Sequence, residues 1–281
     1  MDPCGTLLPM EVPTNERADL PVATAEDTVD DIVRRSGRTG RGFPVRRTFL
    51  QQLDEKGELV PGPLAGLVAA GDHRALLLYL LLLTKASAIP WNAALPAAVW
   101  ARAIGIDLPT SKTATSTISK IWLRLERRHL VARSRFKRMA DITLLCEDGS
   151  GLPYTSPGGA GESYLQIPML LWTAGPEHGG RWYRTLSLPE VAVLLIARSH
   201  GDAFRLPFEE GPRWYGISAD TIARGVKGLR LHGLLATEKT FKKAPLSPVG
   251  YTAEHRYTLH PPFGPIGRTS SSARARRPVA S

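Results

Sequence analysis

Two segments of the chain carry the same pattern of polar, basic and apolar residues. Residues 116–131 read STISKIWLRLERRHLV, residues 220–235 read DTIARGVKGLRLHGLL, and the two align without a gap. Each has Thr-Ile near its start, then a basic residue, and an apolar pair at its end. Hydroxyl and cationic side chains spaced along a helix are the groups that bind phosphates and the edges of bases. The duplication therefore indicates nucleic-acid recognition as the chemistry to consider first.

On a period of 3.6 residues, each copy separates into an apolar face and a polar face. The apolar faces would pack on preceding helices and comprise Ile118, Trp122, Leu125, Ile222, Val226 and Leu229. The polar faces would enter a major groove, and the candidate DNA-binding residues on the two helices are Ser116, Thr117, Ser119, Lys120, Arg124, Arg127, Ser218, Asp220, Thr221, Arg224, Lys227 and Arg230. Small residues such as Ala223 and Gly228 would keep the approach close. A solvated helix face is the alternative for either copy taken singly.

Basic residues also gather in two predicted hairpins and in one stretch before the first folded unit. Strands are expected at 131–134 and 142–145 after the first copy, and at 234–237 and 255–259 after the second. The candidate DNA-binding residues between or beside these strands are Arg133, Arg135, Lys137, Arg138, Lys239, Lys242 and Lys243. A glycine-interrupted arm that could lie along phosphates or in a minor groove offers Arg34, Arg35, Arg38 and Arg41. The alternatives are that the basic hairpin residues serve only solubility, and that the glycine-interrupted stretch is only a flexible linker.

Signals for catalysis or metal binding are lacking in the sequence. It contains no GxxxxGK[ST], no GxGxxG after a strand, no HExxH and no GxSxG. The cysteines Cys4 and Cys146 are far apart and form no CxxC pair, which excludes a zinc finger of the usual kind and a disulfide scaffold. We therefore expect no enzyme, no cofactor, no metal and no small-molecule ligand.

The charge distribution favours a polyanionic partner. The chain has a net charge of +10, but residues 1–31 hold eight acids and one base, so the remainder carries 35 bases against 18 acids. Such a surplus favours binding to nucleic acid, because Lys and Arg release its condensed counterions. The bias of an Arg-rich proteome is the alternative. Residues 75–83 are apolar but too few to span a bilayer, and no signal peptide is evident. We expect a cytoplasmic protein that associates with the nucleoid or a plasmid and has no membrane partner.

Composition shifts divide the chain into five parts. Residues 1–42 are expected to be a disordered acidic N-terminus with the basic arm, and residues 264–281 a disordered basic tail. Two folded units, 43–146 and 164–263, are separated by a linker at 147–163 that is rich in Gly, Ser and Pro. Helices are expected at 75–85, 94–104 and 116–129 in the first unit, and at 187–199, 208–215 and 218–232 in the second. Each unit therefore has three helices followed by two strands.

This order resembles the winged helix-turn-helix family, present here in tandem. In the second unit the resemblance lies in residues 215–224, YGISADTIAR, with Leu229 and residues 232–235, HGLL. In the first unit it lies in residues 104–106, IGI, with residues 116–118, Leu125 and residues 130–131. There His129 stands where Gly is usual, and residues 108–113 insert a longer turn. The resemblance implies a mainly α fold with small β-hairpin wings (α+β), made of two winged helix-turn-helix domains.

The resemblance further implies sequence-specific binding of double-stranded DNA, and three roles stay open. A transcriptional regulator is the first. The second is a plasmid or phage replication initiator that binds origin repeats, because tandem initiators are similar in layout. The third is a winged-helix protein–protein scaffold, against which the basic hairpins argue. A homodimer, the DNA target, and the use of one helix for dimerisation instead of DNA also stay open.

Overall fold

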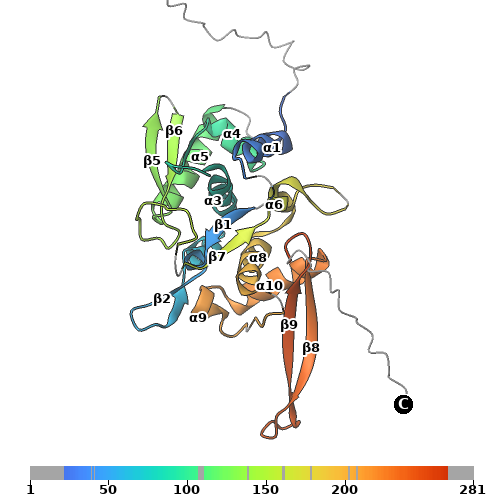
Figure 1. Cartoon of the computed structure of the whole chain (residues 1–281). Coiled ribbons are helices and arrows are strands. Elements are labelled where there is room, and N and C mark those ends of the chain that lie inside the picture. The colour runs from blue at the N-terminus through green and yellow to red at the C-terminus, as the bar shows by residue number, and fades with distance from the viewer. Residues whose placement is uncertain are drawn as a thin grey trace, which may run out of the picture.

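Figure 1 presents a computed structural model of the chain, which describes residues 22–264 except 39, 41, 107–110, 138, 160–161, 178, 202 and 207. The fold is mixed α+β, with helices and small antiparallel sheets. The helices are α1 (Ala25–Arg35), α2 (Leu64–Ala69), α3 (His73–Lys85), α4 (Ala97–Ala103), α5 (Ser111–Glu126), α6 (Leu170–Thr173), α7 (Trp182–Thr185), α8 (Leu188–His200), α9 (Gly211–Tyr215) and α10 (Ala219–Leu231). The strands are β1 (Phe43–Arg46), β2 (Gln51–Leu53), β3 (Leu59–Pro61), β4 (Asn92–Ala94), β5 (Val131–Phe136), β6 (Met139–Leu144), β7 (Tyr164–Ile167), β8 (Leu235–Lys243) and β9 (Tyr251–Leu259).

The first unit is built from α3, α4 and α5 and a three-stranded sheet. Helix α3 begins at Asp72, whose carboxylate accepts a hydrogen bond from the Ala75 amide. The short strand β4 follows α3 and pairs with β6, and β6 pairs with β5, so the sheet order is β4-β6-β5. The sequence predicted the three helices and the hairpin, but it did not predict β4, whose residues Asn92–Ala94 overlap the start of the helix expected at 94–104.

The second unit repeats this order with α8, α9, α10 and the β8–β9 hairpin. Ser187 and Glu190 form the expected capping box at the start of α8, with Pro189 in the first turn. Between α8 and α9, Phe204 forms an isolated antiparallel bridge with Tyr257 of β9, at the place where β4 pairs with β6 in the first unit. Both units therefore have a helix, a strand or bridge, two helices and a hairpin.

The chain before the first unit is partly helical, which corrects the prediction of disorder through residue 42. Helix α1 has a capping box between Thr24 and Asp27, and it buries Thr28, Val29 and Ile32 against the core. The acidic outer face of α1 forms ion pairs with arginines of the second unit: Arg184 binds Glu26 at 2.7 Å, and Arg181 binds Asp30 at 2.9 Å. Residues 1–21 and 265–281, the rest of the two predicted disordered ends, lie outside the described residues.

The two units share one hydrophobic core. Strand β1, at the start of the predicted first unit, pairs antiparallel with β7 at the start of the second, so that Phe43 lies opposite Ile167. The buried Trp172 donates a hydrogen bond from Nε1 to Thr84 Oγ1 of α3 at 2.9 Å. The β1–β7 pair lies between the units in Figure 1, and the two hairpins project from opposite ends of the molecule. The boundary expected between two separate domains is thus a packed contact.

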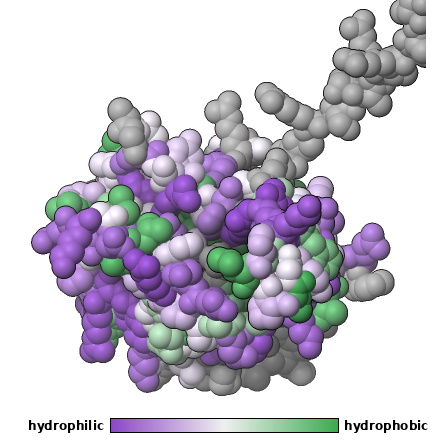
Figure 2. Space-filling view, turned by 90° about the horizontal axis from the view of Figure 1, so that it is seen from below, coloured by the Kyte–Doolittle hydropathy of each residue, from purple (hydrophilic) through white to green (hydrophobic). Residues whose placement is uncertain are grey.

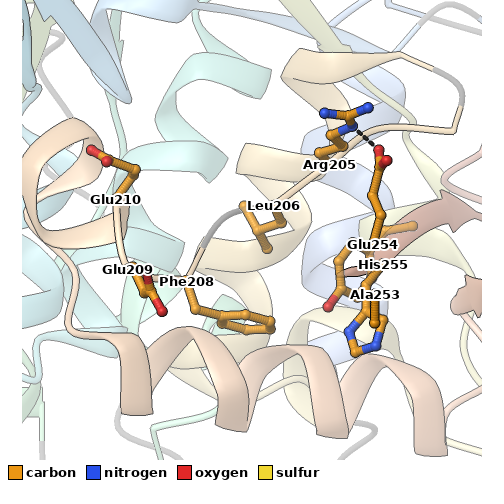
Figure 3. Close-up of a pocket in the computed structure, with 9 residues that line it drawn as sticks. Arg205, Leu206, Phe208, Glu209, Glu210, Ala253, Glu254 and His255 are labelled. Atoms are coloured by element: carbon orange, nitrogen blue, oxygen red, sulfur yellow. Dashed lines mark ion pairs between the residues drawn. The ribbon is translucent and has the colours of Figure 1, made fainter. Parts of the chain in front are cut away.

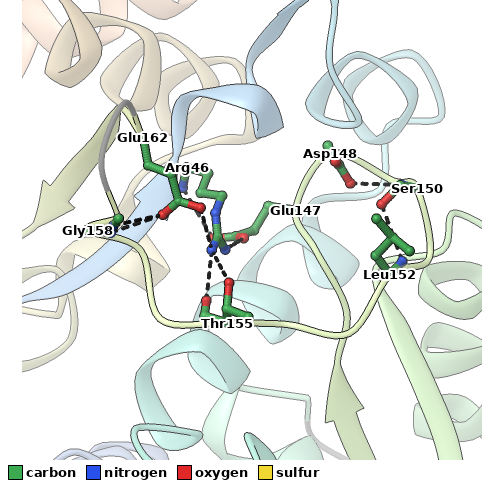
Figure 4. A network of polar contacts seen from close by, with 9 residues as sticks. Arg46, Glu147, Asp148, Ser150, Leu152, Thr155, Gly158 and Glu162 are labelled. Carbon is green, nitrogen blue, oxygen red and sulfur yellow. Dashed lines mark hydrogen bonds and ion pairs between the residues drawn. The ribbon is translucent and has the colours of Figure 1, made fainter.

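The segment expected to be a linker, residues 147–163, is packed against β1 in its described part. Glu147 is fully buried, and its carboxylate accepts hydrogen bonds from the backbone amide and guanidinium of Arg46 (Figure 4). The same guanidinium donates to the carbonyl and hydroxyl of Thr155, and it lies 5.2 Å from the centre of the Tyr154 ring. Burial raises the pKa of Glu147 above its ordinary value, against the opposing effect of Arg46. The described part of the segment therefore contributes to the interior.

Candidate nucleic-acid interface

Helix α10 presents an exposed polar face that begins at its N-terminus. Ser218 caps the helix and accepts a hydrogen bond from the Thr221 amide at 3.2 Å. Arg224 lies one turn later and contacts Asp220 at 3.1 Å and the Thr221 hydroxyl at 3.1 Å. The exposed residues on this face are Ala219, Asp220, Ala223, Arg224, Lys227 and Arg230, and Thr221 is half-buried. The predicted candidates of the second copy thus lie together on one side of one helix.

Helix α10 is held against α8 through a face that combines apolar residues with two glycines. Ile222, Val226 and Leu229 are buried, as predicted. A Cβ atom at Gly225 would lie 2.4 Å from the Pro189 carbonyl oxygen, and one at Gly228 would overlap the Glu190 carboxylate. Gly228 therefore faces α8, and the expectation that it eases the approach to DNA is wrong. The glycines allow the two helix backbones to approach closely.

A tight turn connects α9 to α10. Gly216 closes α9 with a φ of +63°, a left-handed conformation that favours glycine. A Cβ atom there would lie 2.6 Å from the Cβ of Ala65 in α2 and 3.1 Å from that of Pro61 in β3. The turn before α10 therefore packs on the first unit, which positions the N-terminus of α10 relative to α3 and α5.

Helix α5 begins at Ser111, five residues before the start expected from the alignment with α10. Its inner face is as predicted: Ile118, Trp122 and Leu125 are buried, and the Trp122 ring packs edge-on against Trp100 of α4 at 5.4 Å. Most predicted candidates on its outer side are exposed, namely Ser116, Ser119, Lys120 and Arg127, whereas Thr117 is half-buried. Residues 108–110 of the predicted insertion lie outside the described residues.

Arg124 of α5 is engaged by the protein itself. Its guanidinium binds the nearly buried Asp72 carboxylate with two hydrogen bonds, of 2.5 and 2.9 Å. Burial opposes the ionisation of Asp72, but the hydrogen bonds and charge of Arg124 lower the pKa of Asp72 below its ordinary value. Asp72 is also the N-cap of α3, so this pair connects the start of α3 to the last turn of α5. Arg124, expected to read DNA, instead stabilises the fold.

The β5–β6 hairpin is short: Phe136 at the end of β5 lies opposite Met139 at the start of β6, and Lys137 follows Phe136 in the turn. Arg135 and Lys137 are exposed on it, and Arg138 lies outside the described residues. Arg133 binds Glu126 at the end of α5 at 2.7 Å, a contact that fixes the hairpin relative to the helix. Arg135 and Lys137 are thus the described basic side chains of this hairpin best placed to meet a ligand.

The β8–β9 hairpin is much longer than predicted, with nine residues in each strand. Lys239, Lys242 and Lys243 therefore lie within a strand and not in a loop. Lys242 binds Glu254 at 2.6 Å, and Lys239 lies 5.1 Å from the centre of the exposed Phe241 ring. All three lysines are exposed along a ribbon that leaves the body of the molecule in Figure 1.

An open cavity of about 460 Å³ lies beside this ribbon (Figure 3). Arg205 forms an ion pair with Glu254 on one side of the cavity. Glu209 and Glu210 lie on the other, with Phe208 between them and the ribbon. Carboxylates on both sides make the cavity a poor site for phosphate. Among the residues that the structure describes, no cluster of His, Cys, Asp and Glu could hold a metal ion.

The predicted basic arm does not form one continuous feature. Arg34 and Arg35 belong to the last turn of α1, where both pair with Asp31. Arg38 is half-buried, and burial lowers its pKa. Arg41 lies outside the described residues. The structure thus brings together the candidates on α10 and its hairpin, and those on α5 and its hairpin, but it does not place the arm with either set.

Comparisons of the chain with protein-family models, with curated proteins and with solved structures find no match in any of the three. None of the helices within the described ranges combines the length and hydropathy needed to cross a bilayer.

Proposed function

We propose that this chain binds double-stranded DNA in a sequence-specific manner through two winged helix-turn-helix units. The observation that carries the proposal is the repeated order of a helix, a strand or bridge, two helices and a basic hairpin, found at α3–β6 and again at α8–β9. In each unit the third helix buries an apolar face and exposes a polar one. A helix of this kind can enter a major groove, while the hairpin after it contacts the flanking backbone.

Helix α10 is the principal reading helix in this proposal. Its outer side combines the small residues Ala219 and Ala223 with Arg224 and Lys227, all exposed. Small side chains at the N-terminus allow a close approach, and Arg or Lys can donate to guanine or to phosphate. On α5, by contrast, Arg124 is held by Asp72, which leaves Lys120 and Arg127 as the charged candidates. The first unit therefore has weaker means of reading bases and contributes mainly backbone contacts.

Transcriptional regulation is the role we favour, with replication initiation at plasmid or phage origins as the second. Both require a protein that reads duplex DNA, and they differ in where the bound sites lie. Selection of bound fragments from genomic DNA separates them, because promoter sites support regulation and repeats beside an origin support initiation. A protein–protein scaffold, the third role, predicts no duplex binding at all.

The direct test is a binding titration on a selected duplex with Arg224 and Lys227 both replaced by Ala. Loss of two base or phosphate contacts is expected to weaken binding by about 10- to 100-fold at physiological salt and to flatten the salt dependence. The matched control replaces Lys56 and Arg74, two exposed cations that lie outside α10 and outside the β5–β6 and β8–β9 hairpins, by Ala. Equal losses in the two variants would show that only net charge matters and would refute α10 as the reading helix.

A further inference from the structure

The far end of the β8–β9 hairpin exposes a cluster of large apolar side chains. Leu246 is 100% exposed, Val249 64%, Phe241 61% and Tyr251 48%. Phe241 and Tyr251 pack edge-on at 5.4 Å, directly behind the turn that carries the two aliphatic residues. Single exposed apolar residues are common on proteins, but a cluster within eleven residues marks an interaction surface. Figure 2 looks at the molecule from below, the side toward which this hairpin points, and shows hydrophobic residues among hydrophilic ones.

The turn that carries Leu246 and Val249 is an ordered structure. The Ala244 amide donates to the Gly250 carbonyl at 2.9 Å, and the Gly250 amide donates to the Ser247 carbonyl at 2.9 Å. Ser247 closes the turn further, because its amide donates to the Ala244 carbonyl and its hydroxyl to the Tyr251 carbonyl. Pro245 and Pro248, on either side of Leu246, restrict the backbone further. The turn is therefore ordered in the unbound protein, with its apolar side chains exposed to solvent.

The charge around this cluster selects a polyanion as its partner. In the strand register Lys243 pairs with Tyr251 and Lys239 with His255, so both lysines share the face of Phe241. Glu254 and Lys242 lie on the opposite face, where they form an ion pair. One face of the distal ribbon thus combines lysines with aromatic rings and carries no carboxylate from 239 to 243 or from 251 to 255.

The ribbon is long enough to reach a second groove from a helix seated in the first. It starts four residues after the end of α10, and nine residues in a strand span about 30 Å. A minor groove of about 6 Å is too narrow for two strands about 4.8 Å apart with their side chains, unless the DNA is deformed. Apolar side chains that enter between base pairs unstack them, widen the groove and bend the duplex.

We infer that the turn of the β8–β9 hairpin is a wedge, in which Leu246 and Val249 enter the minor groove, unstack a base step and bend the DNA beside the site bound by α10. Phe241 and Tyr251 support the wedge from behind, and Lys239 and Lys243 bind the phosphates that flank it. The inference rests on the proposed function. Beyond the recognition of a DNA sequence by α10, it assigns to the hairpin turn a deformation of the bound DNA.

The test uses the full-length chain and a selected duplex labelled with a fluorophore pair at its ends and with 2-aminopurine at successive steps beside the α10 site. The native protein is expected to increase energy transfer between the ends and to raise 2-aminopurine emission at one step. Replacing Leu246 and Val249 together by Ser is expected to abolish most of both signals while weakening binding by less than about 10-fold. Leu53→Ser is the matched control, since Leu53 is 68% exposed on the β2–β3 hairpin.

The outcomes separate this inference from the proposed function. Duplex binding by the native protein without bending or unstacking overturns the wedge and leaves the proposed function intact. A Ser variant that bends DNA as the native protein does also overturns it. Self-association of the native protein in sedimentation that the Ser variant loses, with bending unchanged, identifies the turn as a contact between copies instead. Absence of any duplex binding overturns both proposals.

Discussion

The buried ion pair between Arg46 of β1 and Glu147 packs the segment after the first unit against β1, and Arg46→Met tests how much this contributes to stability. The Arg46 side chain is 6% exposed and that of Glu147 is fully buried. Met replaces the volume of the arginine stem but none of the hydrogen bonds of the guanidinium to Glu147 and Thr155, and only the backbone amide still donates to Glu147. Removing one partner of a buried pair leaves an uncompensated charge and costs about 3–5 kcal/mol. That is a large fraction of the roughly 5–15 kcal/mol by which a folded domain is stable.

The cost of Arg46→Met is expected to depend on pH. Burial already raises the pKa of Glu147, and losing Arg46 removes the opposing attraction, so the pKa rises further. In the pH interval between the unfolded and folded pKa values, the folded state binds more protons than the unfolded state, and stability therefore falls as pH rises. The variant should lose less stability at about pH 5, where Glu147 is more often neutral, than at about pH 8.

Urea denaturation followed by tryptophan fluorescence at both pH values measures these differences. Arg213→Met is the matched control, because Arg213 forms an ion pair with Glu58 but is 62% exposed, and such pairs contribute about 0–1 kcal/mol. Replacing Arg46 by Met and Glu147 by Leu together should recover much of the loss. A cost of Arg46→Met no larger than that of the control, or one independent of pH, would refute the reasoning.

Three further changes test contacts that hold α10, α5 and α6 in the fold. Gly225→Ala would push α10 about 1 Å further away from α8, because the new Cβ would lie 2.4 Å from the Pro189 carbonyl oxygen. Thermal denaturation is expected to show a loss of about 1–3 kcal/mol, even though Ala has the better helix propensity, and a more stable variant would contradict this. Asp72→Asn removes the charged partner of Arg124. Because the pKa of Asp72 is lowered in the folded state, the native pair stabilises the protein above the unfolded pKa of about 3.9, and this stabilisation is lost as pH falls through the folded pKa. The free energies of unfolding of the native protein and the variant, plotted against pH, should therefore converge in acid. Trp172→Phe loses the hydrogen bond to Thr84 and should cost about 1–3 kcal/mol in urea denaturation, with Thr84→Val as a comparison.

Local patterns in the sequence predicted the helices of the candidate interface, but neither the start of α5 nor the length of the β8–β9 hairpin. The 3.6-residue period located α5 and α10 and their buried faces, and the capping residues Ser187 and Ser218 marked the starts of α8 and α10. These signals come from neighbours along the chain, so they can be read without knowing the fold. Exposure of Arg224 and Lys227 followed directly from the same period.

Long-range contacts explain what the sequence did not predict. Arg124 and Asp72 are fifty-two residues apart, and nothing in either segment indicates that they form a pair. Glu147 lies beside a Gly- and Ser-rich stretch that is typical of a linker, and its burial follows from Arg46, one hundred and one residues earlier. In contrast, α1 had a readable signal that acidic composition obscured: Thr24 and Asp27 match a capping box, and Val29 and Ile32 lie on one face.

The length of the β8–β9 hairpin was also underestimated for a physical reason. Its distal strands alternate lysine with Thr and aromatic residues, and they lack the continuous apolar face that marks a half-buried strand. Here the backbone pairing of residues 235–243 with 251–259 continues well beyond the core. Thr240, Phe241, Tyr251 and Thr252 have high strand propensity, and this signal could have extended the prediction.

The β1–β7 pairing has a consequence for how the protein is made. Phe43 emerges from the ribosome long before Ile167, its partner in the ladder, and synthesis proceeds at about 5–20 residues per second. For several seconds the nascent chain therefore carries an unpaired strand and an unburied Arg46. Contacts of such large sequence separation also slow folding. A ribosome-bound chain that ends before residue 164 should consequently be sensitive to protease at β1.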